Sequence, residues 1–134
     1  MTNHMFRAWD RKLNRMLYIG SFVSLADFFN TKIEQGIESL ELFKVDYKWM
    51  QCIGLRNCNG RDIFEGDIVK DDTNIAVVRF GEYQANNNHS YSNEAAYGFY
   101  LEYISHKGVI DHATNVKYYE VIGNIFENPE LIAS

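Results

Sequence analysis

Cysteine and proline are both scarce in this chain of 134 residues, which contains two cysteines and one proline. Cys52 and Cys58 have no histidine pair nearby to complete a tetrahedral zinc set, so we expect no metal and no cofactor. The low proline content argues against a disordered or linker-rich chain. Apolar runs stay well below the roughly 18 residues of a membrane span. These absences predict a soluble cytoplasmic protein with reduced thiols and no membrane association.

Positive charge is also in short supply, because 18 acidic residues face 13 lysines and arginines and give a formal net charge of −5. Proteins that bind duplex nucleic acid usually carry a basic surplus that neutralises phosphates, so this balance disfavours that class. One local basic run is present, at Arg7, Arg11, Lys12 and Arg15. We interpret this run as the solvated tip of a hairpin.

Aromatic residues are plentiful instead, at 15% of the chain, and such side chains favour strands. Alternation over residues 6–10 and 16–19, with turn residues between them, predicts an N-terminal β-hairpin. A helix N-cap at Ser24, followed by apolar residues at helical spacing, predicts a short helix that must dock on a sheet. Residues 47–53 then predict a further strand.

Closely spaced turns dominate the C-terminal part. The stretch 84–93 is rich in asparagine and predicts a loop, and Gly123 predicts a bulge or a close approach. Pro129 predicts a single terminal helical turn. Short strands separated by such turns are typical of a small barrel, and we expect them at residues 68–70, 75–80, 97–104 and 118–126.

The fold class that these elements predict is mainly β, with minor α+β character. An N-terminal β-hairpin and a short helix precede a small, partly open barrel in the C-terminal part. The length favours a single domain over residues 1–134, with possible lobes at 1–53 and 54–134.

The segment 52–70 concentrates glycine, acidic residues and cysteine. Asn59 and Gly60 supply residues that tolerate positive φ, and Glu65, Gly66 and Asp67 form a second turn. The two carboxylates could bind a cation or act as an acid and base pair. Alternatively, Asp67 accepts backbone amide hydrogen bonds within its turn and Glu65 is solvated, which is the interpretation we favour.

A reactive thiol at Cys58 is a further hypothesis, because Arg56 or Arg61 could lower its pKa. No histidine lies close in sequence to act as its base, so we predict no catalytic residues.

Four aromatic residues of the expected strand 97–104 are the candidate binding residues, namely Tyr97, Phe99, Tyr100 and Tyr103. Aromatic strands on small barrels can stack bases of single-stranded nucleic acid or hold peptides. Stacking platforms also need basic residues, and the nearest are Lys107 and Lys117. Core and interface packing is therefore the interpretation we favour, with Phe99, Leu101 and Tyr103 on one face and Tyr100, Glu102 and Ile104 on the other.

Three motifs in order resemble the YopX-like family of small phage and prophage proteins. They are the opening 6–10 followed by Met16, the central 54–69 with its Asn-Gly and Glu-Gly-Asp turns, and the C-terminal 121–131. The resemblance implies a phage or prophage origin, hence a bacterial host cytoplasm, and an SH3-like barrel in the C-terminal part. It implies no catalytic residues, because the family has no established activity.

The chain is thus expected to be a binding or assembly module and not an enzyme. A protein partner or self-association is the leading expectation, because barrel edges and surplus aromatic residues favour it. The alternative is a single-stranded nucleic-acid-binding accessory protein in phage replication or regulation.

Overall fold

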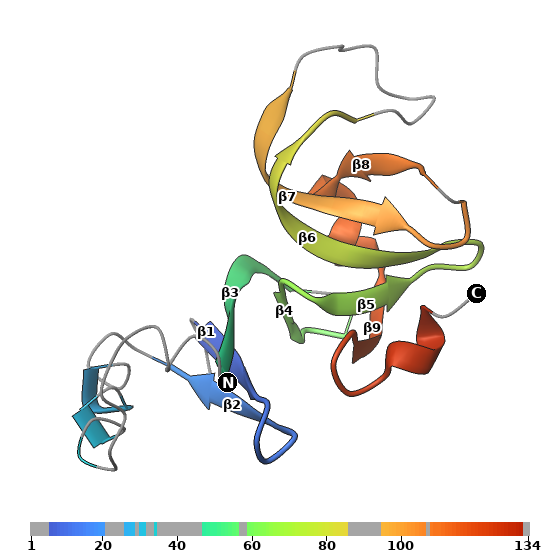
Figure 1. Ribbon diagram of the computed structural model, residues 1–134. Coiled ribbons are helices and arrows are strands. Elements are labelled where there is room, and N and C mark those ends of the chain that lie inside the picture. The colour runs from blue at the N-terminus through green and yellow to red at the C-terminus, as the bar shows by residue number, and fades with distance from the viewer. Residues whose placement is uncertain are drawn as a thin grey trace. The chain divides into compact units, whose positions relative to one another are not determined.

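The structure of the chain is a computed structural model that describes residues 6–20, 26–28, 30, 31, 34, 47–56, 59–85, 95–106 and 108–132 (Figure 1). It consists of two compact units, Met1–Cys52 and Ile53–Ser134. Nine β-strands make up most of the regular secondary structure of the described residues, which confirms the predicted mainly β class. Within the described ranges, no helix is long and apolar enough to cross a membrane.

A β-hairpin opens the first unit, as the sequence predicts. β1 (Phe6–Asp10) pairs antiparallel with β2 (Arg15–Ile19) on one edge and with β3 (Tyr47–Arg56) on the other. The buried carboxylate of Asp10 accepts hydrogen bonds from the backbone amides two and three residues later, at 3.0 and 3.1 Å. These bonds stabilise the hairpin turn, because they satisfy amides that have no strand partner.

Phe28 connects the predicted short helix to the core of the first unit. Residues 26–28, 30, 31 and 34 are helical, whereas the predicted N-cap Ser24 lies outside the described residues. The Phe28 ring packs edge-on against Tyr47, with centroids 5.5 Å apart, and against Trp49, at 5.7 Å. Such docking supplies the stability that so short a helix lacks by itself.

The four residues of the basic run at the hairpin differ in their exposure to solvent. Arg11 and Lys12 are exposed in the turn, and Arg15 is exposed with its Nε 3.7 Å from Oδ2 of Asp10. Arg7, by contrast, is fully buried in β1. Our interpretation of the run as a solvated tip is therefore wrong for Arg7, because this residue lies within β1, which pairs with β2 and β3, and its side chain is buried.

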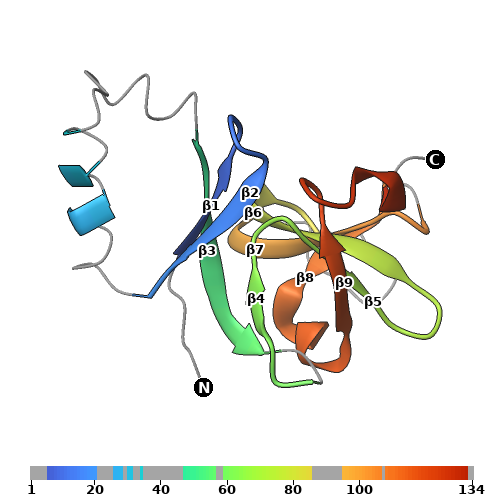
Figure 2. The same cartoon turned by 90° about the horizontal axis from the view of Figure 1, so that it is seen from below.

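Five antiparallel strands form the main sheet of the second unit, in the order β8-β7-β6-β5-β9 (Figures 1 and 2). The two longest strands of this sheet, β6 and β7, pair from Ala76 opposite Tyr103 to Tyr83 opposite Ala96. The strand bounds are β5 Asp67–Lys70, β6 Ile75–Tyr83, β7 Ala96–Tyr103, β8 Ile110–His112 and β9 Glu120–Asn124. The short β4 (Asp62–Phe64) is a neighbour of β3 instead.

A cluster of buried hydrophobic residues lies on one face of the sheet of this unit, and Ile68 and Val77 are buried on the other face. A 3-10 helix, η1 (Ala113–Tyr118), follows β8 and contributes the fully buried Val116. Ile53, Phe99 and Val109 are half-buried and pack against the core. The buried cluster comprises Ile63, Val69, Ala76, Val78, Leu101, Tyr103, Ala113, Val116, Tyr119 and Val121.

β8 and η1 are absent from the sequence prediction, and the last strand differs from it. We predict a strand over 118–126, but Tyr118 belongs to η1 and β9 spans Glu120–Asn124. β8 has three residues, all half-buried, so it shows no alternation that would mark a strand. Its strand geometry comes from pairing with β7, which the local sequence does not reveal.

The bulge predicted at Gly123 is confirmed, and so is the close approach. Ile68 lies opposite Gly123 but Val69 lies opposite Val121, so the register shifts between them. A Cβ placed on Gly123 would lie 2.4 Å from Oδ1 of Asn128. The predicted terminal turn is also present, as the 3-10 helix η2 (Pro129–Leu131).

Candidate binding surface

The turn around Gly66 has a structural role. The buried carboxylate of Asp67 accepts a hydrogen bond from the backbone amide of Phe64 at 2.9 Å, as the favoured interpretation predicts. Gly66 has a φ of 89°, and its amide donates to the carbonyl of Val78 at 2.7 Å. Glu65 is half-buried rather than fully solvated. The turn therefore joins β4, β5 and β6, and its glycine supplies a φ that other residues rarely adopt.

The other turn of the segment lies before β4. Asn59 and Gly60 are exposed there, and Gly60 has the positive φ, 76°, that an Asn-Gly turn predicts. Cys58 lies outside the described residues, so a reactive thiol at this position stays a prediction. Cys52 is half-buried in β3.

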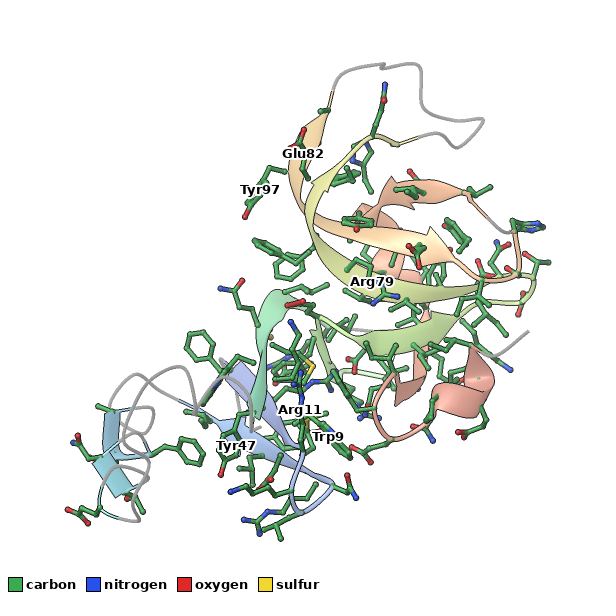
Figure 3. All side chains as sticks on the ribbon, in the orientation of Figure 1. Trp9, Arg11, Tyr47, Arg79, Glu82 and Tyr97 are labelled. Carbon is green, nitrogen blue, oxygen red and sulfur yellow. The ribbon has the colours of Figure 1, made fainter. Side chains whose placement is uncertain are left out.

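The four candidate aromatic residues of β7 do not form one surface. Phe99 and Tyr103 lie on the core face of the strand and Tyr100 lies on the opposite face, as the sequence predicts. Tyr97 also lies on the core face. Tyr103 is buried in the core, whereas Tyr97 is 76% exposed. Figure 3 shows the Tyr97 side chain directed away from the sheet near Glu82. Only Tyr97 and Phe99 thus share an accessible surface.

Phe80 on β6 completes this surface, which we call the aromatic patch (Phe80, Tyr97 and Phe99). The Phe80 ring lies 4.7 Å from that of Phe99 and 5.4 Å from that of Tyr97, in tilted and edge-on geometry. Phe99 also packs against the core, so the patch is anchored at its inner end. Phe80 is 36% exposed and Tyr97 76% exposed. Together they present roughly 200 Å² of accessible surface, given the usual size of aromatic side chains.

The aromatic patch forms because β6 and β7 extend beyond the buried cluster, so the side chains on their core face are no longer covered there. Phe80 lies opposite Phe99 and two residues beyond the core residue Val78, so it has the same side-chain direction. Gly81 and Gly98 lie opposite each other at the next position, with φ of 148° and 150°. Another residue at either position would strain the backbone, because L side chains rarely adopt this φ, although a Cβ would meet no atom within 4 Å.

On β6 and β7, the patch face carries one charged residue, a carboxylate. Glu82 is exposed and lies directly opposite Tyr97. The nearest cation on the hairpin is Arg79, which is on the other face with its Nη2 3.4 Å from Oε1 of Glu102. The residues of β6 and β7 on the patch face are Ala76, Val78, Phe80, Glu82, Tyr97, Phe99, Leu101 and Tyr103.

The opposite face of the hairpin carries a second aromatic group. The rings of Tyr83 and Tyr100 are stacked at 4.8 Å, and His112 from β8 meets Tyr83 edge-on at 5.4 Å. The Tyr83 hydroxyl is hydrogen-bonded to Nδ1 of His112. Burial, and then the charge of Asp111, raise the pKa of Tyr83, so its hydroxyl stays neutral at physiological pH. This group packs β6, β7 and β8 together on the face of the hairpin opposite the aromatic patch.

A buried hydroxyl pair lies in the core of the unit. The hydroxyls of Tyr103 and Tyr119 are 3.0 Å apart. Burial is the main cause that raises the pKa of both, and for Tyr119 the neighbouring Tyr103 and Asp71 raise it further. Asp71 itself accepts backbone amide hydrogen bonds from Thr73 at 3.0 Å and Asn74 at 2.7 Å. The hydrogen bonds of these groups therefore stabilise the fold.

An open cleft of about 540 Å³ lies where β5 ends. Lys70, Asp71, Asp72, Tyr118 and Glu120 line it, so its charges are mixed. Among the described residues, no three histidine, cysteine or acidic side chains come together as a metal site. The cleft thus has polar walls without a defined ligand set, and the aromatic patch is the stronger candidate.

Sequence reasoning does not find Phe80, Glu82 and Tyr83 as surface residues. The expected strand 75–80 stops three residues before the end of β6, because Gly81 resembles a strand end. The signal that could have found them is the alternation of Val78, Phe80 and Glu82, continued through the glycine.

The comparison with protein-family models agrees with the motifs of the sequence. The family model described as YopX protein matches residues 5–133. No curated protein matches the chain. A crystal structure of protein EF1440 from Enterococcus faecalis is similar, with 23% sequence identity and a TM-score of 0.46, over 99% of this chain and 100% of that one. Because the family model covers nearly the whole sequence, this chain belongs to the YopX protein family.

Proposed function

We propose that this protein is a non-catalytic binding module that engages a protein partner through its aromatic patch. The observation that carries the proposal is the exposure of Phe80 and Tyr97 on a face where β6 and β7 contribute one charged residue, Glu82. Covering roughly 200 Å² of such surface contributes about 5 kcal/mol at ~25 cal/mol per Å². Part of this is lost to the cost of association, so the patch would be one anchor of an interface.

The polar groups of the second unit support a non-catalytic role. The residues with a raised tyrosine pKa, Tyr83, Tyr103 and Tyr119, have burial as the main cause, and Asp71 caps a turn. A catalytic base is usually tuned toward physiological pH, and a raised tyrosine pKa moves away from it.

The resemblance to phage and prophage proteins supports a phage or prophage origin and action in the cytoplasm of a bacterial host. The antiparallel order β8-β7-β6-β5-β9 is compatible with the SH3-like barrel that the same resemblance implies. Small barrels of this kind commonly bind peptides.

Single-stranded nucleic-acid binding is the second candidate, favoured by the exposed ring of Tyr97, on which a base could stack. The charge of the face argues against it, because phosphate binding relies on lysine and arginine. Glu82 is exposed beside Tyr97, and Arg79 is on the other face beside Glu102.

The test is affinity capture of the full chain from cells of the bacterial host, with mass spectrometry and nucleic-acid sequencing of the bound material. Tyr97→Ala is compared with Tyr118→Ala, a matched control because Tyr118 is 68% exposed outside the patch. We expect protein recovered by the wild type and by Tyr118→Ala to be lost with Tyr97→Ala, and nuclease treatment to have no effect.

Two results would contradict this proposal. One is recovery of proteins that Tyr97→Ala leaves unchanged. The other is nuclease-sensitive recovery, together with a shift of labelled single-stranded DNA at about 50 mM salt that weakens as salt rises, which would establish the nucleic-acid alternative.

A further inference from the structure

We infer that the open edge of β7 beside the aromatic patch binds an extended, basic segment of a partner protein as an added strand. This inference rests on the proposed function, because it states how the patch would recognise its partner. It is built from three observations on β6, β7 and β8: an uncovered strand edge, the direction of its backbone groups, and one unbalanced carboxylate.

The first observation is that β8 covers only part of β7. Its registered partners on β7 are Tyr100, Leu101 and Glu102. After His112 the chain enters η1 and leaves the sheet. No described residue is registered on this edge against Ala96–Phe99, which includes the two patch residues of β7.

The second observation is the direction of the backbone groups on that edge. The amide of Tyr103 donates to the carbonyl of Val109, on the β8 side, whereas the amide of Ile104 donates to the carbonyl of Ile75, on the β6 side. Successive residues of a strand direct these groups to opposite edges. The amide and carbonyl of Tyr97, six residues from Tyr103, therefore face the open edge, where a strand can pair with them.

The third observation concerns charge. A peptide strand added to β7 would lie about 10 Å from β6, two strand spacings away, with alternate side chains over the patch. An arginine at such a position would cross the Tyr97 ring and reach Glu82, which lies opposite Tyr97. This arrangement combines a cation–π contact with an ion pair. The net charge of −5 attracts the same basic segment at long range.

Other occupants fit these observations less well. A second copy of the chain carries the same charge of −5 and would bring another acidic patch to the edge. A single nucleic-acid strand has no amide and carbonyl groups at the spacing that Tyr97 presents, and its phosphates would meet Glu82.

The probe is a short fluorescein-labelled peptide in which valine and arginine alternate with threonine, titrated with the full chain and followed by anisotropy. Tyr97→Ala and Tyr97→Pro both remove the ring, but only the proline removes the edge amide, and neither alters an amide that faces β6. We expect affinity to fall about tenfold in Tyr97→Ala and roughly fivefold further in Tyr97→Pro. Tyr118→Ala should bind as the wild type does.

Two further arms test backbone and charge without relying on a proline. A peptide N-methylated at alternate residues on its pairing edge should lose binding, while the peptide methylated on its other edge should keep it. Glu82→Gln should weaken the arginine peptide by about threefold and leave a glutamine-substituted peptide unchanged. Circular dichroism of each variant confirms that its fold is retained.

Several outcomes would overturn the inference. They are no binding at about 1 mM peptide, equal binding by the two N-methylated peptides, or no preference for arginine over glutamine. Dimerisation in light scattering that Tyr97→Pro abolishes would assign the edge to a second copy instead. If patch-dependent capture succeeds but the peptide arms fail, the proposed function stands and the added-strand inference alone is wrong.

Discussion

Replacing Gly123 by alanine tests the packing between β9 and the C-terminal turn. The new Cβ would lie 2.4 Å from Oδ1, 2.7 Å from Cγ and 3.0 Å from Cβ of Asn128. The same Oδ1 accepts a hydrogen bond from the amide of Asn124 at 3.2 Å, and the Asn128 amide donates to the Asn124 carbonyl at 2.9 Å. A rotation of the Asn128 side chain cannot remove the whole clash, because its own Cβ is among the close atoms.

The cost of the change follows from these contacts. Overpacking costs about 1–3 kcal/mol, and the lost hydrogen bond about 1 kcal/mol more. Alanine restricts the unfolded chain and returns about 0.4–1 kcal/mol. We therefore expect Gly123→Ala to lower the free energy of unfolding by about 2 kcal/mol, a loss large enough to measure against the 5–15 kcal/mol of a typical domain.

Urea and thermal unfolding of Gly123→Ala, Asn128→Ala and the double variant provide the measurement. Asn128→Ala alone removes the hydrogen bond and should cost about 1 kcal/mol. The double variant should cost about 1 kcal/mol less than the sum of the two, because Oδ1 and Cγ are no longer there to clash. Unchanged stability in Gly123→Ala, or strict additivity in the double variant, would refute this reasoning.

Three further predictions concern polar groups of the same unit. Asp67→Ala should lower the free energy of unfolding by about 1–3 kcal/mol, because the buried amide of Phe64 loses its acceptor, and retained stability in urea would contradict this. Burial raises the pKa of Asp71, but hydrogen bonds to its carboxylate outweigh burial and hold the pKa below the ordinary 3.8. The contribution of the Asp71 carboxylate to the free energy of unfolding is thus complete above pH 3.8 and is lost as the pH falls through the lower pKa of the folded state. Asp71→Asn should therefore make the melting temperature less dependent on pH in the acid range. Burial raises the pKa of Tyr119 and Tyr103 above the ordinary 10.0, so stability should be lost as pH rises beyond that value. Tyr119→Phe should lessen this alkaline loss, and phenolate absorbance should show one late-titrating tyrosine fewer.

Local patterns in the sequence predict most of the fold. The hairpin 6–19, the turn at Asp67, the bulge at Gly123 and the terminal turn at Pro129 are all present in the structure. Each depends on residues close together in sequence, or on a residue type with special backbone properties. β8 is missed because it is defined by pairing with β7.

The candidate site is predicted less completely. Tyr97 and Phe99 share an exposed face, but Tyr103 is buried and Tyr100 is on the other side of the sheet. A period of two places Tyr97, Phe99 and Tyr103 on one face, yet it does not state where the core ends. Phe80 joins the patch through the β6–β7 register, which the sequence of neither strand reveals.

The sequence by itself determined the β class, the turns and the membership of the YopX protein family, because these depend on composition, local spacing and motifs. Only the tertiary structure decided which aromatic side chains are covered and which strand edge has no registered partner among the described residues. Burial depends on what packs against a face, as η1 does against the core, and an open edge depends on where a neighbouring strand stops, as β8 does at His112. Both are set by contacts between segments distant in sequence, and the aromatic patch with its adjacent edge is their product.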